Sequence, residues 1–237
     1  MKLTFAASVL AVALGCASGS PVDLAERATA TGCNSYKLVT VRGTFVPQNS
    51  TLGYAGMLSQ TKAAVSGGAS YDIVYPAMVD FPDSLPKGVT ALARYLSTQI
   101  KSCPSQKLAL IGYSQGAEVI DRVTQYILPT KNATLFHAIK AIVLIGDPLH
   151  TPGNSANVDS KGGNSTAKYE GHALLEGSKV IPQAYNKAKK LLNICADKDS
   201  ICATSEPGSN FDAHLSYIQD AGVQKLGSKF IIARLQA

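Results

Sequence analysis

The chain lacks long apolar runs beyond its first residues, which excludes a membrane-spanning helix of about 20 residues from the rest of the sequence. It also lacks a basic stripe interleaved with aromatic side chains, although 22 Lys and Arg against 16 Asp and Glu give a net charge of +6. We therefore expect neither a membrane nor a nucleic acid as partner. Internal repeats are absent too, and 237 residues suit one well-buried domain.

The first 19 residues have the pattern of a secretory signal peptide. Lys2 supplies the positive charge, residues 3–14 the short apolar core, and residues 17–19 a small-residue cleavage site. Residues 20–27 are a possible pro-segment, which leaves a single catalytic domain over residues 28–237. The sequence thus predicts a secreted, extracellular protein.

Cysteine is scarce, and its few positions indicate disulfides. One of the five, Cys16, lies inside the signal, so Cys33, Cys103, Cys195 and Cys202 remain in an oxidising compartment. Three pairings of four cysteines are possible. The short spacing of Cys195 and Cys202 favours a local bridge, and the other two cysteines would then pair.

Three N-x-S/T triplets, at Asn49, Asn132 and Asn164, are compatible with a glycosylated product. Such triplets also occur by chance. We treat them as candidate glycan sites.

Apolar runs alternate with helical patterns along the chain. Strands are expected at residues 36–41, 71–75, 108–111, 139–145 and 191–194, and helices at 53–65, 86–100, 117–128 and 212–235. This alternation predicts an α/β fold, with five parallel strands and helices on both faces. Function is expected at the carboxyl ends of the strands. The polar stretch 146–168 could shape a cleft or be a surface excursion, and no insertion resembles a lid.

A G-x-S-x-G motif at residues 112–116 lies between an expected strand and an expected helix, the context in which this motif indicates a catalytic serine. The buried strand 108–111 precedes it, and a helical pattern follows as far as the residue before Pro129. Strand, tight turn and helix make a nucleophile elbow, which holds its serine in a strained conformation with the hydroxyl exposed. Ser114 is the expected nucleophile.

A serine hydroxyl needs a base to become nucleophilic, and four histidines are available. His137 lies just before the fourth expected strand and suits the surface. His150 and His172 border or lie in the polar stretch, where a solvent-exposed role is expected. His214 follows the last strand at the start of the closing helix, where a turn can return it over the sheet, so we expect His214 to be the base. Activity should then fall below pH about 6 to 7.

The base needs an acid, and several carboxylates precede His214. Asp199 is preferred because a Cys195–Cys202 bridge would hold its loop at the end of the fifth strand. Asp197 is the alternative. A surface role for the whole acidic loop is the competing interpretation.

The oxyanion of the reaction needs donors that already point at it. The backbone N–H of Gln115, next to the nucleophile, is the first candidate. Thr44, in the loop after the first strand, offers a second N–H and a hydroxyl.

Several segments together resemble the cutinase family, which includes acetylxylan esterases. They are RGT at 42–44, LPKG at 85–88, GYSQGA at 112–117, the loop 195–202 and AHL at 213–215. The resemblance extends from Cys33 to the C-terminus.

The resemblance implies a compact α/β-hydrolase fold without a lid. It implies the triad Ser114, Asp199 and His214, and an oxyanion hole at Thr44 and Gln115. It also implies the disulfides Cys33–Cys103 and Cys195–Cys202. Neither a metal nor an organic cofactor is expected.

The substrate is less well determined. Asp83 replaces an asparagine that commonly supports the oxyanion residue in cutinases, and residues 205–212 are polar where known cutinases are apolar beside the histidine. Acetylxylan esterases, however, tend to carry more disulfides. We therefore predict a monomeric esterase acting on cutin or a similar polyester, with acetylated xylan as the alternative polymeric substrate. A non-catalytic secreted protein that binds cell walls or a host is the rival from another class.

Overall fold

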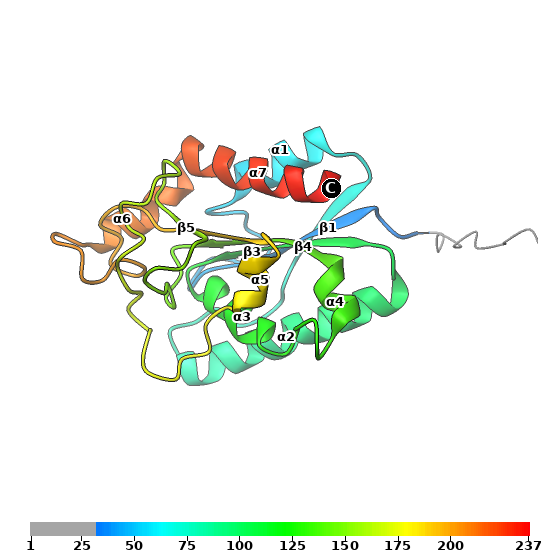
Figure 1. Cartoon of the computed structure of the whole chain (residues 1–237), viewed down its shortest axis with the longest axis horizontal. Coiled ribbons are helices and arrows are strands. Elements are labelled where there is room, and N and C mark those ends of the chain that lie inside the picture. The colour runs from blue at the N-terminus through cyan, green and yellow to red at the C-terminus, as the bar shows by residue number, and fades with distance from the viewer. Residues whose placement is uncertain (1–31) are drawn as a thin grey trace, which may run out of the picture.

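A twisted parallel sheet forms the middle layer of the computed structural model, which describes residues 32–237 (Figure 1). The strands are β1 (Tyr36–Val41), β2 (Gly68–Asp72), β3 (Lys107–Tyr113), β4 (Ile139–Ile145), β5 (Asn157–Val158) and β6 (Leu191–Ile194). They lie in the order β2-β1-β3-β4-β6-β5, and every pair is parallel. The expected signal peptide and pro-segment lie outside the described residues.

The sheet has six strands, so the predicted count of five is corrected by one. The additional strand, β5, has two residues and pairs with β6 at the sheet edge, opposite Asn193 and Ile194. It lies inside the polar stretch 146–168. A two-residue strand without apolar alternation gives no periodic signal, and sequence reasoning therefore assigned this stretch to a loop.

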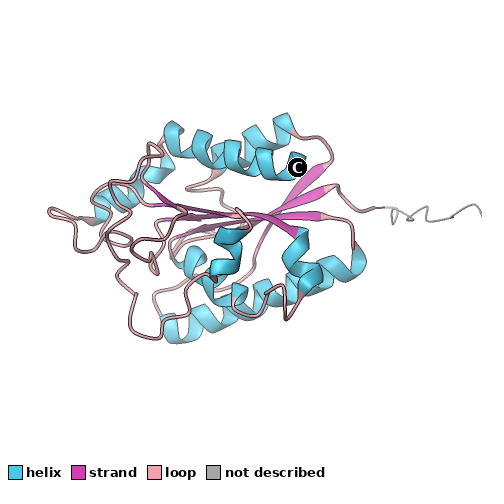
Figure 2. Ribbon diagram, in the orientation of Figure 1, coloured by secondary structure: helices cyan, strands magenta, loops and turns pink. Residues whose placement is uncertain are grey.

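Helices cover both faces of the sheet. They are α1 (Ala55–Ala64), α2 (Phe81–Ser102), α3 (Gln115–Thr124), α4 (Ala133–Ala138), α5 (Gln183–Lys187), α6 (Phe211–Leu215), the 3-10 helix η1 (Ser216–Ile218) and α7 (Ala221–Gln236). Helices α1 and α7 lie on one face, and α2 to α5 lie on the other (Figure 2). The short α6 lies with the long loops at one end of the sheet (Figure 1).

The inner strands are apolar on both faces because helices bury both. In β3, Leu108 and Leu110 join the core under α2 and α3, whereas Ala109 and Ile111 join the core under α7. The rest of this central sheet alternates in the same way. The site at the strand ends therefore rests on a packed, two-sided core.

The expected closing helix 212–235 is interrupted. Helix α6 passes into η1, and α7 starts afresh after Asp220, whose carboxylate accepts hydrogen bonds from the N–H groups of Gly222 (2.8 Å) and Val223 (3.1 Å). An N-terminal cap of this kind satisfies N–H groups that a new helix leaves free. The interruption places His214 on α6, outside the long helix.

Both expected disulfides are present. Cys33–Cys103 joins the chain before β1 to the end of α2, and Cys195–Cys202 closes a short loop directly after β6. Within residues 32–237, no helix is both long enough and apolar enough to cross a membrane.

Candidate active site

Ser114 lies at a sharp turn between β3 and α3. Its backbone has φ 55° and ψ −124°, a conformation that a non-glycine residue adopts only under strain. A Cβ on Gly116 would lie 2.0 Å from the carbonyl oxygen of Val41, and one on Gly112 would lie 2.7 Å from the Cα of Ala117. Glycine is therefore required at both positions, and the junction has the geometry of the expected nucleophile elbow.

His214 and Asp199 form a buried pair. The imidazole Nδ1 lies 2.9 Å from Asp199 Oδ2 and 3.0 Å from Oδ1, and the two side chains are 2% and 0% exposed. With Nδ1 bound to the carboxylate, Nε2 is the nitrogen left for Ser114, which lines the same cavity as His214. The structure thus brings together the three residues that the sequence singled out.

Gly146, at the end of β4, makes room for this pair. Its φ is +57°, and a Cβ there would lie 2.7 Å from His214 Cε1 and 3.1 Å from Asp199 Oδ2. The strand between β3 and β6 therefore ends without a side chain where the imidazole and the carboxylate meet.

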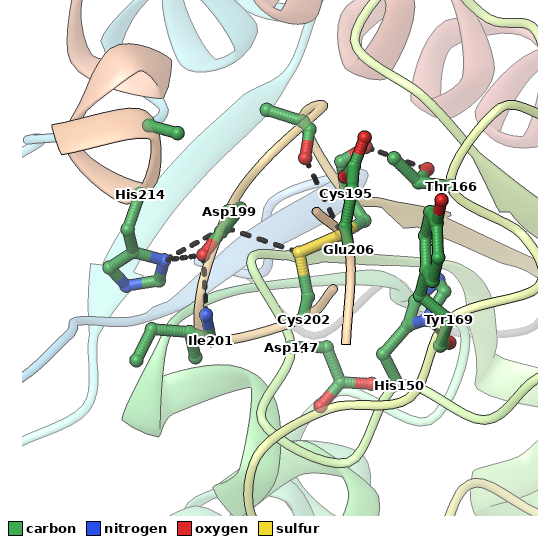
Figure 3. Close-up of a disulfide and its surroundings, with 12 residues drawn as sticks. Asp147, His150, Thr166, Tyr169, Cys195, Asp199, Ile201, Cys202, Glu206 and His214 are labelled. Carbon is green, nitrogen blue, oxygen red and sulfur yellow. Dashed lines mark hydrogen bonds and ion pairs between the residues drawn. A yellow bond between two sulfur atoms is a disulfide. The ribbon is translucent and has the colours of Figure 1, made fainter. Parts of the chain in front are cut away.

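The loop after β6 fixes the Asp199 carboxylate (Figure 3). Oδ1 accepts from the Ile201 N–H at 2.8 Å, and Oδ2 accepts from the Tyr217 hydroxyl at 2.6 Å. The Cys202 sulfur lies 3.2 Å from Oδ2, a contact without a proton because this sulfur is in the Cys195–Cys202 disulfide. Sequence reasoning found the bridge and missed Tyr217.

The alternative acid lies elsewhere. Asp197 is exposed, and its Oδ1 accepts from the Ser165 hydroxyl at 2.5 Å rather than facing His214.

The other three histidines differ in their solvent exposure. His137 is exposed, as expected, and His172 is exposed at the edge of the cavity. His150 contradicts the expected solvent-exposed role: it is 0% exposed, and its Nδ1 lies 2.9 Å from the Tyr169 carbonyl oxygen. Burial lowers its pKa. The chain just after the polar stretch returns to this histidine, where the Gly171 N–H donates to the His150 carbonyl at 2.9 Å.

A buried arginine holds the loop that carries Thr44. The Arg42 guanidinium donates to the carbonyls of Val46 (2.8 Å), Ile73 (3.1 Å) and Tyr75, and it stacks on the Tyr75 ring, whose hydroxyl donates back to the Arg42 carbonyl at 2.5 Å. Thr44 lines the cavity beside Ser114. Sequence reasoning used Arg42 only as part of a motif. The anchoring role of Arg42 depends on carbonyls about 30 residues away in the chain.

The Gln115 side chain is also anchored. Its Nε2 donates to the Met78 carbonyl at 2.9 Å, and its Oε1 accepts from the Ser84 hydroxyl at 3.1 Å. Ser84 also accepts from the Met78 N–H at 3.1 Å. Asp83 instead pairs with Lys87 at the surface, at 2.7 Å. The buried support beside the elbow therefore comes from Ser84, which sequence reasoning did not single out.

The site opens into a cavity of about 400 Å³. Its walls include the exposed apolar side chains Phe45, Leu52, Val79, Phe81, Phe211 and Leu215. Phe211 and Leu215 flank His214 on α6, and Phe211 is 56% exposed. The polar segment 205–212 thus contains one aromatic residue, Phe211, which lies at the cavity, and apolar side chains flank the histidine.

Two carboxyl groups are buried next to each other behind the elbow helix. Asp147, after β4, accepts from the Leu149 N–H at 2.8 Å and the Asn193 amide at 2.9 Å, whereas Asp121 on α3 is in contact with Asp147. Burial, followed by the charge of Asp147, raises the pKa of Asp121 well above its ordinary value. Burial also raises the pKa of Asp147. The charged form of Asp121 is therefore disfavoured in the native state.

In the part of the chain that the structure describes, the side chains that could bind a metal ion do not form a suitable site. The one group there with three potential ligands close together is Cys195, Asp199 and Cys202. Its two sulfurs are joined in a disulfide, so neither can act as a thiolate ligand.

Comparisons with known proteins agree with this geometry. The Cutinase family model matches residues 32–235. An acetylxylan esterase of Hypocrea jecorina is 28% identical over 93% of this chain and 74% of its own, and carboxylesterase Culp1 of Mycobacterium tuberculosis is 31% identical over 86% and 82%. The solved structure of a cutinase-like protein from Cryptococcus sp. has a TM-score of 0.78 and 35% identity, covering 88% of this chain and 98% of its own. The chain therefore belongs to the cutinase family and is a serine carboxylic-ester hydrolase.

Proposed function

We propose that Ser114, His214 and Asp199 form the catalytic triad of this esterase. The observation that carries the proposal is the buried contact of 2.9 Å between His214 and Asp199, at the same cavity as the strained Ser114. A strained serine, an oriented imidazole and a buried carboxylate are the parts that activate a hydroxyl.

The reaction proceeds through an acyl-enzyme. Ser114 Oγ attacks the ester carbonyl while His214 Nε2 takes its proton, and the imidazolium, stabilised by Asp199, then protonates the departing alcohol. Water then attacks the acyl carbon while giving a proton to His214, and the imidazolium returns that proton to Ser114 Oγ as the carboxylic acid leaves. The backbone N–H of Gln115, the first residue of α3, and Thr44 bind the negative oxygen in both tetrahedral intermediates.

Substitution of Ser114 by Ala tests the triad directly. S114A should fold as the wild type does, with turnover reduced by about 10⁴-fold or more. Covalent labelling by an organophosphate should occur in the wild type and vanish in S114A, which also tests the rival, non-catalytic function. Turnover retained by the folded variant would refute the assignment.

We propose further that the enzyme prefers apolar acyl groups longer than acetyl, as found in cutin or similar polyesters. A cavity of about 400 Å³ with Phe45, Val79 and Phe211 at its edge offers more apolar surface than an acetyl group can cover. Each buried methylene contributes about 0.8 kcal/mol, so chain length should be strongly discriminated.

Deacetylation of xylan is the alternative, because an acetylxylan esterase is 28% identical over 93% of this chain. Hydrolysis rates for p-nitrophenyl acetate, butyrate, octanoate and laurate, measured beside cutin and acetylated xylan, distinguish the two. A rising kcat/KM from acetate to butyrate or beyond, with release of cutin monomers, is expected. Strict acetate preference with xylan deacetylation would replace our proposal.

Secretion as a monomer completes the proposal. Two disulfides suit an oxidising compartment, and the candidate glycan sites Asn49, Asn132 and Asn164 are exposed. Enzyme recovered from culture medium should lose mass on glycosidase treatment and elute as a monomer in gel filtration. Retention inside the cell would contradict this part of the proposal.

A further inference from the structure

We propose that Tyr217 is a positioning residue for ester hydrolysis, whose hydroxyl holds Asp199 toward His214 and thereby sets the pH range in which the base works. The inference rests on the triad proposed above. Tyr217 lies on η1, just after α6, behind His214, and is not itself one of the residues that line the cavity.

The direction of the Tyr217 hydrogen bond is fixed by its second partner. The hydroxyl oxygen accepts from the Ala196 N–H at 2.7 Å and lies 2.6 Å from Asp199 Oδ2. A backbone N–H can only donate, so the single phenolic proton is directed at the carboxylate. Burial, followed by the charge of Asp199, raises the pKa of Tyr217 well above its ordinary value. The side chain therefore remains a neutral donor throughout the working pH range.

The ring of Tyr217 is as constrained as its hydroxyl. It is 0% exposed and meets the His214 ring at 89° and the Tyr113 ring at 73°, each with centroids 6.0 Å apart. Tyr113 in turn donates to the His214 carbonyl at 2.9 Å. The Tyr217 ring is thus held by its packing against His214 and Tyr113, with its hydroxyl at Asp199.

Each oxygen of the Asp199 carboxylate accepts a hydrogen bond from a different donor besides His214, so loss of the Tyr217 hydroxyl leaves one oxygen without its donor. Oδ1 is held by the Ile201 N–H, and Oδ2 by Tyr217, while both lie within 3.0 Å of His214 Nδ1. Without Tyr217, rotation about the Cβ–Cγ bond of Asp199 is limited on one side only. Negative charge on Oδ2 would also be less dispersed, so the imidazolium would be held more strongly.

Several titratable groups face this pair from the neighbouring elements. They are Tyr113 of β3, His150 after β4 and, across the cavity, His172. Burial raises the pKa of Tyr113, and burial lowers that of His150, so both are neutral near pH 7. Tyr217, unlike these three, hydrogen-bonds to Asp199 itself.

The chain offers a matched control. Tyr185 is also 0% exposed, and its hydroxyl donates to the Ile127 carbonyl at 2.6 Å, but it belongs to the core on the opposite face of the sheet. Tyr217→Phe and Tyr185→Phe each remove one buried hydroxyl. A purely structural role predicts similar effects of the two substitutions.

The test compares the two variants with the wild type in kcat, KM and the pH dependence of kcat/KM on p-nitrophenyl butyrate. Active-site titration with an organophosphate corrects for the folded fraction. For Y217F we expect kcat to fall about tenfold, KM to change little, and the acid limb of the profile to move to higher pH. Y185F should keep the kcat and the profile of the wild type.

Incorporation of 3-fluorotyrosine at position 217 supplies a second measurement if Y217F folds poorly. Fluorine makes the hydroxyl a stronger donor while keeping the ring, so the acid limb should move to lower pH. A kcat and a profile unchanged in Y217F, or unchanged with fluorotyrosine, would overturn the role of Tyr217. Loss of activity in S114A would still stand in that case, and the triad would be unaffected.

Discussion

Removal of the short disulfide should cost more activity than removal of the long one, although it should cost less stability. Cys195 and Cys202 are 7 residues apart, whereas Cys33 and Cys103 are 70 apart. The entropy of closing loops of these lengths corresponds to roughly 2.5 and 4 kcal/mol of folding free energy. If both disulfides served stability alone, removal of Cys33–Cys103 would cause the larger loss of activity as well as the larger loss of stability.

In the proposed triad, activity depends on a different quantity, the position of Asp199. The short bridge closes the loop that carries this carboxylate, with a sulfur 3.2 Å from Oδ2, whereas the long bridge lies where β1 begins, at the opposite end of the sheet strands. Displacement of a catalytic group by about 1 Å can cost 10²-fold in rate. For Cys195→Ala/Cys202→Ala we expect kcat/KM to fall about 10- to 100-fold.

The assay is urea unfolding of both double variants, together with kcat/KM on p-nitrophenyl butyrate under conditions in which each is folded. Cys33→Ala/Cys103→Ala should show the lower unfolding midpoint and nearly wild-type kcat/KM. Equal activities of the two folded variants would refute the view that the short bridge positions the acid.

Two further predictions concern buried polar groups. Asp121 binds a proton in the native state that it releases in the unfolded state above about pH 4, so wild-type stability falls as pH rises toward the raised pKa of Asp121. Asp121→Asn should therefore gain stability relative to the wild type as pH rises above about pH 4 in urea unfolding, and a difference that does not vary with pH would contradict this. Ser84→Ala leaves Gln115 Oε1 and the Met78 N–H without their partner, which should lower the unfolding free energy by about 1–3 kcal/mol, with a smaller kcat; unchanged calorimetric stability would argue against the support we assign to Ser84.

Local sequence predicted those features that depend on local signals. The elbow at Ser114 has a strand before it, a helix after it and glycines on either side, and each of these is visible in consecutive residues. His214 and Asp199 followed from the chain order of the triad, from the spacing of two cysteines and from the family resemblance. The apolar inner strands were predicted because burial on both faces removes polar residues from them.

The features that sequence reasoning missed depend on contacts between distant residues. Arg42 donates to carbonyls of residues 73 and 75, and nothing near residue 42 predicts that its charge is buried. His150 looked solvent-exposed because its neighbours in sequence are polar, yet it is buried, in contact with Tyr169 and Gly171 about 20 residues further along the chain. Tyr217 was assigned to a continuous helix, because a break capped by Asp220 leaves the apolar pattern almost unchanged.

The order of the strands also has a consequence for how the enzyme matures. Thr44 follows β1, Ser114 follows β3 and Asp199 follows β6, and β4 lies between the last two. Parallel pairing of this kind joins segments far apart in the chain, and such contacts form late because loop closure must come first. The site is therefore complete only when β1, β3, β4 and β6 are all paired. We therefore expect a newly made chain to be inactive until these four strands are in register, so that hydrolysis reports their assembly.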